Sequence, residues 1–209
     1  MNTIGRAMEF VMPIVWSIRN AIFSAILFLG LSGIAIAKTG LPQAIEVSNQ
    51  DSLIFHGHEL YVTHSDESKT RSTVHLSEDL HRAINTASTV LFPEHRSLNV
   101  AGKEYILIVV GHPSSSRPEG FCGAGEEDVL YVAEFDRGRL ETKYTNLVRS
   151  CLKNIELESD GTESPIKSIT WIDSPAGFRV AWLSDEQGAE TIQTYWVEGS
   201  KFTAVGLEH

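Results

Sequence analysis

A polar segment between two predicted strands holds the residues best suited to contact another molecule. Its eighteen residues run from 111 to 128 and include two prolines. Long connections in compact domains are often binding loops, and serine hydroxyls are small donors and acceptors that can enter a narrow site. We therefore expect this loop to insert into the cleft of a partner protein, with a solvated loop without a partner as the alternative. The predicted contact residues are His112, Ser114, Ser115, Ser116, Arg117 and Glu119.

Catalysis by the same segment is not expected. His112, the serines and Glu126 could suggest a hydrolase triad, but the segment lacks the Gly-x-Ser-x-Gly pattern of a nucleophile elbow. Cys122 is followed closely by three acidic residues at 126–128, whose negative charges disfavour a reactive thiolate. The segment therefore indicates a binding protein and not an enzyme.

The two cysteines, Cys122 and Cys151, indicate a disulfide. Both follow the N-terminal leader described below, and an even number of cysteines in an oxidising compartment favours pairing. Closing a loop of about 30 residues would stabilise the domain by about 3–4 kcal/mol through the entropy of the unfolded chain.

Two histidines are the candidates for a transition-metal site. His56 and His58 are two positions apart on a strand predicted over 53–63, which would point both rings to the same face. Imidazole is a good ligand for zinc or copper, but no complete set of ligands accompanies the pair. We therefore expect no bound metal and no other cofactor.

The N-terminal segment 1–37 is predicted to be a signal peptide. Arg6 and Arg19 carry positive charge before an apolar run over 21–36. The segment ends in Ala-Ile-Ala, which offers small side chains for cleavage. We expect cleavage after Ala37, release into the periplasm and no stable membrane insertion. The alternatives are a start at a later methionine, or a segment that stays attached as an anchor.

The rest of the chain is acidic and long enough for one domain. Residues 38–206 suffice for a single core, and 207–209 are expected to be the remnant of an expression tag. The formal net charge of the sequence is −10, and the part after the leader is close to −11 because the leader contains two Arg and one Glu. Such a surface repels nucleic acid and favours a basic protein partner.

Apolar and polar residues alternate along most of this domain, which is typical of strands. One helix is expected over 77–87, with Ser77 as its cap and an apolar stripe packed on a sheet. The prediction is a mainly β fold with one short helix, an antiparallel meander arranged either as a small irregular propeller-like fold or as a two-sheet sandwich. Strands are predicted over 44–48, 53–63, 72–76, 103–111, 129–135, 140–148, 154–158, 168–172, 178–183, 191–197 and 201–205.

The leader, the compact β domain and the serine-containing loop near Cys122 resemble periplasmic immunity proteins that neutralise cell-wall amidase toxins delivered by type VI secretion. By residue, the resemblance covers only the loop around Ser114, Ser115, Ser116 and Cys122. It implies that the loop plugs the catalytic cleft of the toxin and blocks its Cys-His site. The partner would then be a secreted peptidoglycan amidase.

Two other functions stay open at this point. Trp171, Trp182 and Trp196 lie on three successive predicted strands and could line a groove for an envelope glycan or a small ligand, although large aromatics at strand spacing usually form core. A metal-dependent hydrolase built on His56 and His58 is the second alternative.

Overall fold

The computed structural model describes residues 44–65, 70–115 and 119–208 of the 209-residue chain. All of them belong to the unit Thr39–His209, so the predicted signal peptide over 1–37 and its cleavage position lie outside the described residues. Within the described ranges, no helix has the length and apolar character needed to cross a membrane.

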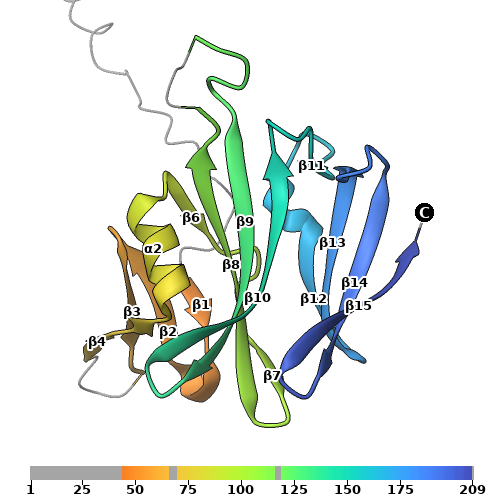
Figure 1. The fold of residues 1–209 in the computed structure, drawn as a ribbon. Coiled ribbons are helices and arrows are strands. Elements are labelled where there is room, and N and C mark those ends of the chain that lie inside the picture. Colours follow the sequence, from red (N-terminus) through yellow and green to blue (C-terminus); the bar gives the residue numbers. More distant parts are fainter. Residues whose placement is uncertain (1–43, 66–69, 116–118, 209) are drawn as a thin grey trace, which may run out of the picture. The chain divides into compact units, whose positions relative to one another are not determined.

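The described residues form a mainly β fold of three sheets with one short α-helix, as the sequence predicted (Figure 1). In spatial order, the N-terminal sheet contains β1 (Ala44–Glu46), β2 (Ser52–His56), β3 (Glu59–Thr63) and β4 (Arg71–Thr73). The central sheet contains β5 (His75–Leu76), β10 (Arg139–Ser150), β9 (Glu126–Asp136), β8 (Lys103–Pro113) and β6 (Thr89–Leu91), with β7 (Leu98–Val100) also paired to β8. The C-terminal sheet contains β11 (Glu156–Leu157), β13 (Ala176–Ser184), β14 (Thr191–Glu198) and β15 (Lys201–Glu208), with β12 (Ile169–Asp173) paired to β13.

Strand β8 is covered on both faces, which places the central sheet in the middle of the domain. Every residue from Glu104 to Gly111 is buried. Successive side chains of a strand point to opposite faces, so Leu107 contributes to the core shared with the C-terminal sheet and Ile108 to the core shared with the helix and the N-terminal sheet. The nearly continuous apolar run of β8 is therefore explained by burial on two sides.

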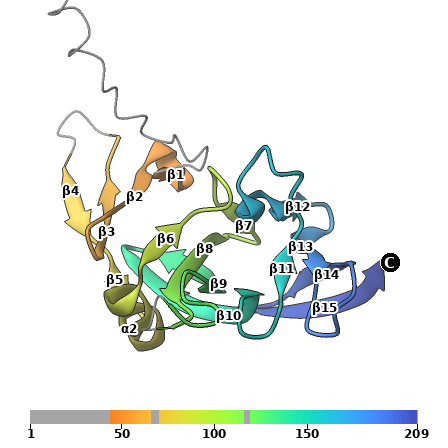
Figure 2. The same ribbon diagram turned by 90° about the horizontal axis from the view of Figure 1, so that it is seen from above.

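The first core is formed by residues of the central and C-terminal sheets. The second core lies on the opposite face of the central sheet, under the helix and the N-terminal sheet. Figure 2 shows β8, β9 and β10 between β1–β4 on one side and β12–β15 on the other. The additional layer on the second face was not predicted.

The predicted helix is present as α2 (Glu78–Thr86), and its buried residues are Leu80, Ala83 and Ile84. Ser77 occupies the position before the helix, but its side chain makes no capping hydrogen bond. The Ser77 hydroxyl instead pairs with the hydroxyl of Thr142 at 2.9 Å. The predicted capping role was therefore wrong, and this hydroxyl ties the start of α2 to β10.

Several details differ from the predicted strands. The single strand predicted over 72–76 is divided between β4 in the N-terminal sheet and β5 in the central sheet. The single strand over 53–63 is a hairpin of β2 and β3, because Gly57 (φ +67°) and His58 form a turn between them. Strands β6 and β7 were missed; each is three residues long and pairs with β8. Strand β15 runs through Leu207 and Glu208, two residues past the expected end of the domain.

Candidate functional site: the disulfide-linked tip

The predicted binding loop is shorter than the sequence indicated, because β8 continues to Pro113 and β9 begins at Glu126. The connection between them covers residues 114–125, and it extends beyond the paired ends of the two strands (Figure 1). Two of the predicted contact residues, Ser116 and Arg117, lie outside the described residues.

The predicted disulfide is present and joins this connection to a second loop. Cys122 and Cys151 are 29 positions apart in the sequence, and their Cα atoms are 5.7 Å apart. Cys151 lies in the turn 151–154, which follows β10. We use the name tip for the described residues of these two segments, 114–115, 119–125 and 151–154.

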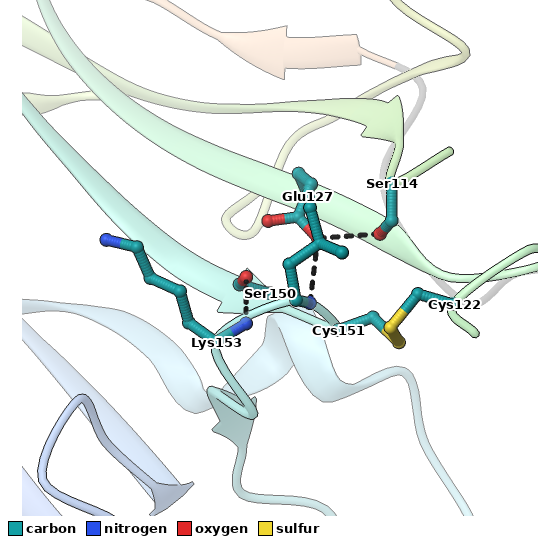
Figure 3. The surroundings of a disulfide bond; sticks show 7 residues. Ser114, Cys122, Glu127, Ser150, Cys151 and Lys153 are labelled. Carbon is teal, nitrogen blue, oxygen red and sulfur yellow. Dashed lines mark hydrogen bonds between the residues drawn. A yellow bond between two sulfur atoms is a disulfide. The ribbon is translucent and has the colours of Figure 1, made fainter. Parts of the chain in front are cut away.

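The carboxylate of Glu127 holds the base of the tip together (Figure 3). Its Oε1 accepts hydrogen bonds from the Ser114 hydroxyl at 2.6 Å and from the backbone N–H of Leu152 at 3.2 Å. Partial burial alone would raise the pKa of Glu127, but hydrogen bonds from Ser114, Ser150 and two backbone N–H groups outweigh it and lower the pKa below its ordinary value. The ionised Glu127 therefore links the two segments that the disulfide also joins.

Ser114 supports the tip and does not offer a free hydroxyl to a partner. Besides its bond to Glu127, its backbone N–H donates to the carbonyl of Gly125 at 2.9 Å. A Cβ atom at Gly125 would lie only 2.5 Å from Cβ of Cys151 and 3.1 Å from the Ser114 hydroxyl. The close approach of the two segments therefore depends on glycine at this position.

Two large apolar side chains project from the tip, each next to a half-cystine. Phe121 precedes Cys122 and is 87% exposed, and Leu152 follows Cys151 and is 58% exposed. These are the two most exposed large apolar residues of the described chain. The predicted binding segment, 112–121, ends at Phe121, but neither residue was among the predicted contact residues, because their neighbours in sequence do not show which side of the disulfide faces the protein.

The other predicted contact residues are spread over different surroundings. His112 is half-buried on β8, where its Nδ1 lies 3.1 Å from the carbonyl oxygen of Thr86 at the end of α2. Ser115 is half-buried, and Glu119 is exposed in the connection itself. The structure thus brings Ser114, Cys122 and Glu119 to the tip region, while His112 contacts the end of the helix.

The histidine pair does not have the predicted geometry. His56 is the last residue of β2 and His58 lies in the turn, where its Nδ1 is 3.3 Å from the carbonyl oxygen of Ile84. The prediction that both rings share one face of a strand was therefore wrong. In the ranges that the structure describes, no group of three or more His, Cys, Asp or Glu side chains is placed to hold a metal ion.

The tryptophans do not line a common groove. Trp171 and Trp182 are buried in the first core, where their indole N–H groups donate to the carbonyls of Arg96 and Val148, both at 3.0 Å. Trp196 is half-buried. The core interpretation is therefore correct for Trp171 and Trp182. Of the three tryptophans expected to line a glycan groove, two are buried in the core.

Comparisons of the chain with protein-family models, with curated proteins and with solved structures returned no match.

Proposed function

We propose that the chain is an exported binding protein whose tip enters the cleft of a cell-wall-degrading amidase and blocks it, as periplasmic immunity proteins do. The observation that carries this proposal is the exposure of Phe121 beside a half-cystine. Aromatic side chains bury much apolar area in a binding pocket and are among the residues that dominate binding energy. Phe121 is the proposed anchor, and Leu152 extends the same apolar contact.

The construction of the tip favours insertion into a preformed cleft. The disulfide and the Glu127 hydrogen bonds hold the two segments against each other at their base. A loop that is already ordered loses less conformational entropy when it docks, so more of the contact energy is kept as affinity. We propose binding without catalysis at the tip.

The negative charge of the protein indicates the charge of its partner. The sequence carries a formal net charge of −10, and Glu119 is exposed within the tip. An acidic inhibitor attracts a basic enzyme over a distance of about one Debye length, which is roughly 8–10 Å at ordinary ionic strength. The proposed partner is therefore a basic peptidoglycan amidase.

The test is inhibition, with capture used only to obtain the enzyme. Tagged mature protein is used to isolate peptidoglycan amidases from the envelope fraction and from the secreted proteins of competing cells, and the purified amidase is assayed on peptidoglycan. Stoichiometric inhibition by the wild type, weakened at least about tenfold by Phe121→Ala, supports the proposal.

Leu183→Ala is the matched control, because Leu183 is also a large exposed apolar residue, 50% exposed, but lies on β13. It should inhibit as the wild type does. An amidase that is not inhibited, or inhibition that survives Phe121→Ala unchanged, would exclude the tip as the inhibitory element.

A further inference from the structure

A second constellation lies in the N-terminal sheet and is independent of the tip. Oδ2 of Asp51 is 2.8 Å from Nδ1 of His64, and Nε2 of the same imidazole is 3.3 Å from the hydroxyl oxygen of Ser72. The three side chains therefore form a continuous chain of carboxylate, imidazole and hydroxyl. This is the arrangement by which a histidine activates a serine nucleophile while a carboxylate orients the ring.

Strand pairing places these three residues together. Ser72 on β4 pairs with Val62 on β3, and His64 is two positions beyond Val62, so His64 lies on the same side of the hairpin as Ser72. Asp51 directly precedes β2, whose first residue pairs with Thr63. The start of β2, the end of β3 and the start of β4 thus lie side by side at one end of the sheet.

Backbone contacts hold the orienting groups in place. Oδ1 of Asp51 accepts a hydrogen bond from the backbone N–H of Ser65 at 3.0 Å, which leaves Oδ2 for the imidazole. The backbone N–H of His64 donates to the carbonyl of Thr70 at 3.1 Å. With the proton of the ring on Nδ1 and directed to Asp51, Nε2 is the acceptor that faces Ser72.

The constellation opens into a pocket of about 440 Å³. This volume lies within the usual range of small-ligand sites, about 300–1,000 Å³. Val62 forms part of the wall, and Asn99, whose side-chain amide has two N–H donors, also lines the pocket.

Charge limits which substrates this pocket can take. Its lining includes the carboxylates of Asp51, Glu104 and Asp136, whereas the guanidinium of Arg137 is paired with Asp136. Glu104 is buried and accepts hydrogen bonds from the Ser97 hydroxyl at 2.6 Å and from a backbone N–H. Such a lining repels anions, so it disfavours phosphate esters and carboxylates and favours neutral or cationic compounds.

We propose that Asp51, His64 and Ser72 form a nucleophilic serine site that hydrolyses small neutral or cationic carboxylic esters. The hydroxyl oxygen of Ser72 attacks the acyl carbon while its proton passes to Nε2 of His64. The ester bond breaks, the alcohol leaves with that proton, and the acyl group stays on Ser72. Water then attacks this acyl group and gives a proton to His64, the acid is released, and the proton returns to Ser72.

This activity goes beyond the proposed function, because neither Phe121 nor the disulfide takes part in it. The catalytic residues are Ser72 and His64, which touch the reacting atoms. Asp51 is a positioning residue that acts through His64.

The test uses the mature protein with two probes, a fluorophosphonate that labels activated serines and p-nitrophenyl acetate as a small neutral ester. Peptide mapping of the wild-type protein should place the fluorophosphonate on Ser72. Ester turnover should fall by about 100-fold or more in Ser72→Ala and in His64→Ala. Asp51→Asn should lower kcat with little change in KM, because it disturbs the ring tautomer and not the binding of the ester.

Ser159→Ala is the control, since Ser159 is an exposed serine in the connection that follows β11. It should keep both the labelling and the turnover. Absence of fluorophosphonate from Ser72 in the wild type, or ester turnover that persists in Ser72→Ala, overturns the proposal. Because labelling is mapped on the wild type, the result does not depend on the folding of a variant.

Discussion

Arg149 donates from its Nε to Oδ2 of Asp128 at 2.7 Å, across the paired strands β10 and β9. Asp128 is fully buried, and Arg149 also forms an ion pair with Glu126. Burial raises the pKa of Asp128, and the guanidinium of Arg149 opposes this shift without cancelling it. Arg149 lies two residues before Cys151, so this ion pair is next to the base of the disulfide-linked tip.

Removal of Arg149 should therefore be costly. In Arg149→Met, the buried carboxylate of Asp128 loses its cation, and breaking a buried pair from one side costs about 3 kcal/mol. The free energy of unfolding in urea at neutral pH measures this loss. Arg179→Met is the control, since Arg179 is exposed on β13, and it should change stability by less than about 0.5 kcal/mol. Equal stability of Arg149→Met and the wild type would show that the pair does not support the fold.

The low pKa of Glu127 predicts a dependence of stability on pH. The folded protein stabilises the ionised carboxylate, so this contribution is present above the pKa of the unfolded chain, about 4.3, and is lost as the pH falls through the folded pKa. Glu127→Gln should therefore be less stable than the wild type at pH 7, and the difference should narrow below about pH 4. Urea unfolding of both proteins across this range gives the comparison. A difference that stays constant down to pH 3 would contradict the assignment.

The disulfide should contribute to stability in the same region. Mature protein denatured without reductant is expected to show no titratable thiol, and reduction should lower the free energy of unfolding by about 3 kcal/mol. The double variant Cys122→Ala and Cys151→Ala should behave like the reduced wild type. Two titratable thiols per chain before reduction would mean that the bond does not form.

The histidine groove should not be a transition-metal site. His56 and His58 line a groove of about 690 Å³ together with His75 and His81, but His56 ends a strand while His58 lies in the turn after it. The purified protein is expected to contain no stoichiometric zinc or copper, and the double variant His56→Ala and His58→Ala should keep its melting temperature. Elemental analysis that finds about one zinc per chain, lost in this variant, would disprove the expectation.

Much of the fold follows from local patterns in the sequence. The apolar run over 103–111 predicts β8, the spacing of Leu80, Ala83 and Ile84 predicts α2, and two cysteines after a predicted leader predict the disulfide. Each of these features is determined by residues close in sequence or by residue type. The break at Gly57 escaped prediction, although residues 56–59 contain no apolar side chain and the glycine itself is a turn signal.

The candidate sites depend on contacts between distant residues, and these could not be derived from the sequence. Glu127 reaches Ser114 from thirteen positions away and the backbone of Leu152 from 25. Asp51 and His64 are also thirteen positions apart, and they meet because β2 and β3 form a hairpin. The exposure of Phe121 depends on the fold of the loop next to the disulfide. Residue type alone therefore directed attention to the serines of the loop and away from its aromatic side chain.

The tip predicts a separation between stability and binding. Phe121 is 87% exposed, so Phe121→Ala removes almost no packing within the protein, and its free energy of unfolding should match that of the wild type within about 0.5 kcal/mol. Binding to the amidase should weaken by about 2 kcal/mol, a factor of roughly 30, mainly through faster dissociation.

Ser114→Ala should lower the free energy of unfolding more than it weakens binding, because the Ser114 hydroxyl bonds to Glu127 and supports the fold of the tip. Urea unfolding and surface plasmon resonance at two salt concentrations measure both quantities, and association should slow as salt rises. Unchanged dissociation of Phe121→Ala, with an intact fold, would move the interface away from the tip.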